Sequence, residues 1–231
     1  MLKYSVVTIA LMLTVSSVAL ATVAVVYPSD DSFVWRFAPN NNYGSYNEAT
    51  IGKDALELIW EFWARLFSRY RFNYEHMWTA LRFDVTPYSG ITLDSAKVAV
   101  YIYKTRGTFP PNEVWVAKCS GNWDENEITW NNRPNYHDWH VPPAPEYAWW
   151  TIDVTTWAQK WIDGAYPNYG IWIGTNATGR DYFDIYTKET IGTIADPQLI
   201  LYYTEGSVEL TFPILEGVFV RILRNSSLLY R

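Results

Sequence analysis

Short apolar and aromatic runs, separated by clusters of Pro, Gly, Asn and Asp, fill the chain beyond its N-terminal segment. Such runs are typical of β-strands joined by turns, and no long helical pattern alternates with them, which argues against a parallel α/β architecture. The pattern predicts an all-β fold, an antiparallel sandwich or barrel with one or two short helices. The nine expected strands are 23–27, 32–37, 79–85, 97–104, 113–118, 149–154, 169–175, 182–187 and 198–203.

Aromatic residues are abundant and chemically reactive ones are scarce. The 231-residue chain holds 13 Trp and 18 Tyr but a single cysteine, Cys119, and three histidines. This composition supplies apolar surface for a large core and argues against disorder. One cysteine excludes an intramolecular disulfide, and Cys119 is expected to be a buried free thiol. The net charge of −6 offers no basic field for phosphate backbones, which argues against nucleic acid as a partner.

The first 21 residues have the features of a secretory signal peptide. Lys3 precedes an apolar run at 4–18, and Ala19-Leu20-Ala21 has the small-x-small form of a cleavage site. We expect cleavage after Ala21 and a protein that is secreted, to the extracellular space or the cell surface. An uncleaved anchor is the alternative, because the apolar character continues to Val26; the protein would contact a membrane only if this segment were retained.

Two stretches have helical rather than strand spacing. Thr156 and Gln159 fit a capping box that begins a short helix, which Gly164 ends. Between Asp54 and Tyr70 the apolar residues also recur at helical spacing, although a long hairpin strand fits their alternation too. The expected role of this second helix is to pack on the sandwich; the alternative is an exposed aromatic face that docks a partner or a membrane surface.

Several motifs occur in the order typical of one family. The most specific runs from Trp123 to Pro134 and reads Trp-Asp-Glu-Asn-Glu-Ile-Thr-Trp-Asn-Asn-Arg-Pro. Asp31-Ser-Phe-Val and the Asn-rich segment 39–45 precede it. The remaining motifs are 81–85, 87–90, 94–98, 150–155, 168–171 and 197–202. Together they resemble DNRLRE domains, also described as disaggregatase-related domains and similar to alginate-binding carbohydrate-binding modules.

The resemblance covers about residues 23–203. It implies a secreted β-sandwich of jelly-roll type, usually non-catalytic and often attached to polysaccharide-active enzymes or surface proteins. The expected organisation is a signal peptide at 1–21, a sandwich at 22–204 with an insertion at 53–78, and a C-terminal β-rich extension at 205–231. The extension holds two β-like runs, 208–212 and 217–223, which would form an extra hairpin or pair with a neighbouring molecule.

The residue types present give catalysis little support, and we expect the protein not to be an enzyme. The chain has no Gly-x-Ser-x-Gly elbow, and Cys119 has no histidine near it in the sequence. His137 and His140 lie three apart in a Pro-rich loop, short of the ligands that a structural metal site needs. Glu125 and its acidic neighbours could supply the carboxylate pair of a glycosidase, so hydrolysis stays as the third hypothesis.

Glycan binding uses aromatic faces that stack on the C–H surfaces of sugars, and cations where the sugar is a uronate. Loop positions are the most accessible ones for such side chains. The carbohydrate-binding candidates are Tyr136, Trp139, Tyr147, Trp149, Arg133 and Arg180. The tryptophans on predicted elements are assigned to the core instead: Trp115, Trp130, Trp157, Trp161 and Trp172.

No motif requires a cofactor, and calcium is the one metal that the sequence suggests. Calcium takes carboxylate and backbone oxygens, and Asp30, Asp31 and Asp196 flank strands where a structural site could form. Each of these aspartates taken singly is also typical of a solvated turn.

Two hypotheses for function follow from these features. The first is a non-catalytic, secreted β-sandwich that binds extracellular or cell-surface polysaccharide. The alternative is a structural subunit of an extracellular sheath or filament, in which the run 208–223 or the N-terminal strand pairs with other copies of the protein.

Overall fold

The computed structural model describes residues 20–54, 75–107, 114–143, 145, 148–175, 181–190 and 195–205. Most of the expected helix at 54–70 and of the insertion at 53–78 therefore lies outside the described residues, as do residues 1–19 and 206–231. Val23–Tyr203 forms one compact unit. In the part of the chain that is described, no helix is both long and apolar enough to cross a membrane.

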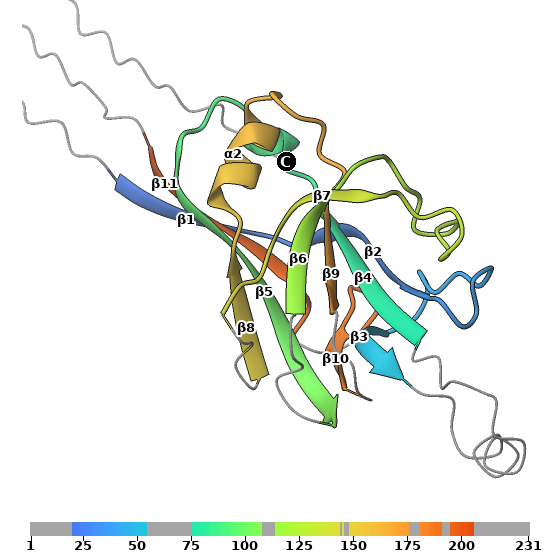
Figure 1. The fold of residues 1–231 in the computed structure, drawn as a ribbon. Coiled ribbons are helices and arrows are strands. Elements are labelled where there is room, and N and C mark those ends of the chain that lie inside the picture. The colour runs from blue at the N-terminus through green and yellow to red at the C-terminus, as the bar shows by residue number, and fades with distance from the viewer. Residues whose placement is uncertain are drawn as a thin grey trace, which may run out of the picture. The chain divides into compact units, whose positions relative to one another are not determined.

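The described residues form eleven strands, one α-helix and one 3-10 turn (Figure 1). The first strands are β1 (Leu20–Val26), β2 (Pro28–Trp35), β3 (Glu48–Asp54), β4 (Glu75–Phe83), β5 (Leu93–Arg106) and β6 (Val114–Cys119). The others are β7 (Tyr136–His140), β8 (Ala148–Asp153), β9 (Ile171–Thr175), β10 (Tyr182–Tyr186) and β11 (Gln198–Glu205). The helix is α2 (Thr155–Ile162) and the 3-10 turn is η1 (Thr86–Tyr88). The predicted all-β fold is confirmed.

Two strands, β4 and β5, organise the sheet because each pairs with three others. β4 pairs with β2 along one edge and with β3 and β9 along the other. β5 pairs with β8, and with β11 and β10 on successive parts of its length. All of these pairs are antiparallel. The order β1-β11-β5-β10-β3-β4-β9-β6-β7 thus brings two layers together, one around β4 and one around β5, with β3 and β10 joining them.

Alternate residues of both layers fill the space between them. Val98, Val100 and Ile102 of β5 face inward and are fully buried, as their alternation predicted. They share one core cluster with Leu81 of β4 and Ile173 of β9 in the other layer. Burying a side chain of this kind stabilises the fold by roughly 1.5–3 kcal/mol. The two layers therefore form a β-sandwich around a common core.

A second core covers the outer face of the layer around β4. Trp115 of β6 and Trp172 of β9 point to this side and are buried. The β6–β7 loop, residues 120–135, covers them with Trp123 and Ile128, and the Trp123 indole N–H donates to the Tyr169 carbonyl at 2.8 Å. β6 and β9 are consequently buried along their whole length on both faces. The most specific sequence motif, Trp123–Pro134, thus forms most of the loop that covers the outer face of this layer.

The capping box expected at Thr156 does not form. α2 begins at Thr155, and its N-cap, Val154, has no side-chain cap hydrogen bond. Gln159 instead accepts the Leu93 N–H at 2.7 Å, so it ties the helix to the start of β5. The predicted end is correct, because α2 stops just before Gly164, whose positive φ of 67° suits a residue without a side chain.

Two strands had no counterpart among the predicted elements. β3 carries two buried apolar side chains, those of Ala49 and Ile51, and is otherwise polar or glycine, so its apolar alternation is short. β7 is an exposed edge strand whose pairing with β6 is irregular near Asp138, a residue with φ of 53°. Neither segment has the long period-2 pattern that identifies a strand from sequence.

Candidate functional site

One aromatic surface lies on the outer face of β4, β6 and β7. Its centre is Trp78 of β4, whose ring centroid is 4.8 Å from that of Trp130 and 5.6 Å from that of Tyr136. Tyr136 also stacks on the buried Trp115 at 4.7 Å. Trp78 and Trp130 are half-buried and Tyr136 is 40% exposed. We call Trp78, Trp130, Tyr136 and the neighbouring Arg133 the aromatic platform.

Arg133 supplies the charge of this platform. Its guanidinium carbon lies 3.7 Å from the centroid of the Trp130 ring and 4.8 Å from that of Trp78, and the group donates to the Trp130 carbonyl. Burial and the nearby Arg36 guanidinium lower the pKa of Arg133. None of the described carboxylates forms an ion pair with Arg133. An arginine remains charged in such surroundings, so this cation is available to an anion from outside.

The structure brings two of the predicted binding residues together, Arg133 and Tyr136. Trp139 is 60% exposed and lies on the same edge strand as Tyr136, β7. Trp149 lies in the other layer, on β8. Tyr147 and Arg180 fall outside the described residues.

The tryptophans assigned to the core divide into two groups. Trp115, Trp161 and Trp172 are buried, as expected. Trp130 and Trp157 are half-buried and pack against the two cores, so their assignment to the core is correct only in part. Trp130 stands on the β6–β7 loop and Trp157 on the side of α2 that faces His140, and motif or helical spacing alone does not define how deeply such side chains are buried.

Trp149 belongs to a second aromatic row, on the outer face of β8, β5 and β10. Its ring centroid is 5.4 Å from that of Tyr101, and Tyr186 stacks on Tyr101 at 6.0 Å and on Tyr103 at 4.4 Å. Burial and the neighbouring Glu48 carboxylate raise the pKa of Tyr103. The carboxylate beside this row makes it a poorer surface for an acidic sugar than the aromatic platform.

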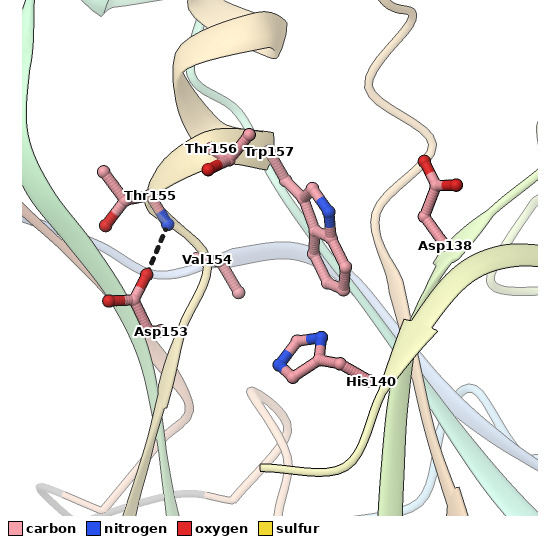
Figure 2. Close-up of a pocket in the computed structure, with 7 residues that line it drawn as sticks. All are labelled: Asp138, His140, Asp153, Val154, Thr155, Thr156 and Trp157. Atoms are coloured by element: carbon pink, nitrogen blue, oxygen red, sulfur yellow. Dashed lines mark hydrogen bonds between the residues drawn. The ribbon is translucent and has the colours of Figure 1, made fainter.

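A shallow pocket of about 400 Å³ lies between β7 and the start of α2 (Figure 2). It is lined by Asp138, His140, Asp153, Val154, Thr155, Thr156 and Trp157. His140 and Trp157 face each other across it, with ring centroids 5.0 Å apart. The Lys118 ammonium, 2.6 Å from Asp138, lowers the pKa of that carboxyl. A glycosidase general acid needs a raised pKa, so Asp138 is poorly suited to that role.

The residues predicted to bind calcium separate in the structure. Asp31 is buried beside Glu125 and Glu189. Asp30, next to it in the sequence, instead pairs with Arg82 at 2.8 Å, and Asp196 lies outside this carboxylate cluster. Burial and the Glu189 carboxylate raise the pKa of Asp31 to about 8. Sequence reasoning placed Glu125 in a structural motif and missed Glu189 altogether.

Comparison with known proteins gives one family and several partial relatives. A family model described as carbohydrate-binding module family 96 matches residues 22–203. The tRNA nuclease WapA of Bacillus subtilis (strain 168) is 25% identical over 161 residues, which are 67% of this chain and 6% of that protein. A tRNA3(Ser)-specific nuclease WapA of Bacillus spizizenii is 25% identical over 104 residues, 43% of this chain and 4% of the relative. The chain thus spans a small part of the length of these relatives.

Proposed function

The chain belongs to carbohydrate-binding module family 96, and we propose that it is a secreted, non-catalytic protein that binds an acidic polysaccharide of the extracellular space or cell surface. The observation that carries the acidic specificity is the position of Arg133, a cation without a described acidic partner held over two indole rings. The proposed binding surface is the aromatic platform.

The platform combines the two kinds of contact that a polyuronate offers. Tyr136, which is 40% exposed, and the accessible parts of the half-buried Trp78 and Trp130 would contact the C–H surfaces of sugar rings. The Arg133 guanidinium would pair with a ring carboxylate, and its planar donors suit a bidentate contact. Arg36, close enough to lower the Arg133 pKa, adds a second positive charge beside Arg133.

The nuclease activity named for the relatives is not proposed for this chain. The match covers 6% of those proteins, and the net charge of −6 gives no basic field to attract tRNA. Polysaccharide hydrolysis is not proposed either, because the family is one of carbohydrate-binding modules and because Asp138 in the pocket, whose pKa Lys118 lowers, is poorly suited to be the general acid.

Affinity electrophoresis with a matched pair of polysaccharides tests the proposal. We expect polygalacturonate in the gel to retard the protein, and its methyl ester, which has the same backbone without the charge, to retard it much less. The retardation should weaken as salt is added, because salt screens exposed charges. Unchanged mobility with both polymers, together with unchanged tryptophan fluorescence on titration, would contradict binding.

A second candidate function, a subunit of an extracellular sheath or filament, rests on β1. This strand stands at one end of the strand order, and Val23, Val25 and Tyr27 on or beside it are 45–57% exposed. An edge strand with exposed apolar side chains is suited to pairing with a strand of another copy. The tail run 208–223, the other expected pairing segment, lies outside the described residues.

Negative-stain microscopy of concentrated protein distinguishes this candidate from the first. A subunit that assembles through β1 is expected to form filaments or sheets, and a Val25→Lys variant should remain dispersed because a charge interrupts the apolar edge. Uniform particles of monomer size for the unsubstituted protein would eliminate the candidate.

A further inference from the structure

Three carboxylates from distant parts of the chain meet at one buried point. They belong to Asp31 of β2, to Glu125 of the β6–β7 loop and to Glu189 of the turn after β10. One oxygen atom of each lies within 4.8 Å of the others. Asp31 has no exposed surface, and the side chains of Glu125 and Glu189 are 12% and 25% exposed. Water therefore screens their mutual repulsion poorly.

Lys188 and two backbone N–H groups satisfy part of this cluster. The Lys188 ammonium lies 2.7 Å from the Glu125 carboxylate and also contacts Glu189 Oε1. The Lys188 N–H donates to Asp31 Oδ2 at 2.8 Å, and the Asp31 N–H donates to Glu125 Oε1 at 3.0 Å. Two buried oxygens, Asp31 Oδ1 and Glu189 Oε2, have no hydrogen-bond partner among the described residues. These two atoms need a donor or a cation.

The charges of the cluster do not balance. In the described part of the chain, three carboxylates face one ammonium, that of Lys188, which leaves an excess of two negative charges when all three are ionised. A divalent cation would cancel this excess, and both unpartnered oxygens could coordinate it. The ligand atoms are all carboxylate oxygens, without a histidine or cysteine, and this donor set favours a hard cation over zinc.

We propose that Asp31, Glu125 and Glu189 bind a calcium ion. Calcium accepts carboxylate ligands in irregular arrangements, whereas magnesium requires nearly ideal octahedral geometry and retains several of its waters. Asp31 and Glu189 contribute their unpartnered oxygens, and the Lys188 ammonium stays beside the ion as the partner that orients the Glu125 carboxylate. The site joins β2, the β6–β7 loop and the turn after β10, and the loop also carries Trp130 and Arg133. The calcium site does not depend on the polysaccharide proposal.

Thermal unfolding of the full chain in calcium, magnesium and EGTA tests the site. A ligand that binds only the folded protein raises its melting temperature. We expect calcium to raise the melting temperature by several degrees over EGTA, and magnesium to raise it less. Asp31→Asn should abolish the calcium response. Asp30→Asn is the matched control, because Asp30 is the adjacent residue, pairs with Arg82 and lies outside the cluster, and it should retain the response.

Terbium luminescence gives a second measurement on the unsubstituted protein, which decides the question even if Asp31→Asn does not fold. Tryptophan-sensitised emission that saturates with terbium and is displaced by calcium supports the site. A melting temperature that is the same in calcium and EGTA, together with no sensitised emission, overturns it. The proposal is also overturned if Asp31→Asn melts at a higher temperature than the native protein in every buffer and neither protein responds to calcium. That result would mean that a proton shared between the carboxylates, rather than a metal ion, offsets their charge.

Discussion

Replacing Arg133 with glutamine is expected to lower the affinity for polygalacturonate at least tenfold. The substitution keeps a polar side chain but removes the cation that lies on Trp130 and Trp78. A hydrogen bond to a charged group contributes about 1.5–3 kcal/mol, and about 1.4 kcal/mol corresponds to a factor of ten in the dissociation constant. Calorimetric titration of both proteins at low and high salt measures the change, and the salt dependence should be weaker in the variant.

Lys97→Gln is the control for this substitution. It changes the net charge by the same amount, but Lys97 is an exposed residue of β5 and belongs to the other layer of the sandwich. Its affinity should equal that of the unsubstituted protein. An equal loss for the two variants would mean that overall charge, rather than the aromatic platform, attracts the polysaccharide.

Replacing Trp172 with alanine is expected to reduce the free energy of unfolding by about 3–5 kcal/mol, the range typical of a tryptophan removed from a core. Trp172 has no exposed surface and lies in the outer core under the β6–β7 loop. Its indole N–H has no hydrogen-bond partner within the described ranges, so the expected loss comes from packing. Urea unfolding followed by circular dichroism gives the difference from the midpoint and the slope.

Trp139→Ala makes the same chemical change at an exposed position. Trp139 is 60% exposed on β7, so its removal should alter the free energy of unfolding by no more than about 0.5 kcal/mol. Equal losses for Trp172→Ala and Trp139→Ala would contradict the assignment of a second core to this face of the sheet.

The strands that the sequence identified are those whose side chains alternate against a core. Val98, Val100 and Ile102 are a clear case, because every second residue of β5 from Ala96 to Ile102 is fully buried between the layers. β7 could not be found in this way, since its side chains meet solvent rather than a core and its pairing shifts beside Asp138. The capping box at Thr156 failed because Gln159 is engaged by β5, a partner distant in sequence.

Part of the aromatic platform could be predicted from the sequence, because aromatic and cationic residues between predicted strands indicate a glycan-binding surface. Arg133 and Tyr136 were found, whereas Trp78 stands within a strand, and nothing in the sequence says which face of β4 would remain open. The carboxylate cluster could not be predicted from the sequence either, because its members are far apart along the chain. Asp31 contacts Glu125 across a sequence separation of 94 residues and Lys188 across 157, so only the fold brings these groups together.

The two-sided burial of β6 and β9 has a consequence for how a ligand is received. A strand with a core on each face cannot bend toward either without opening a void, because protein interiors are packed almost as densely as crystals. Trp78 and Tyr136 stand on the strands that flank this rigid pair, so the spacing between their rings is set before any sugar arrives. If the aromatic platform binds the polysaccharide as proposed, little conformational entropy would be lost on association, and a polymer whose repeat matches that spacing would be selected over one that required the surface to adapt.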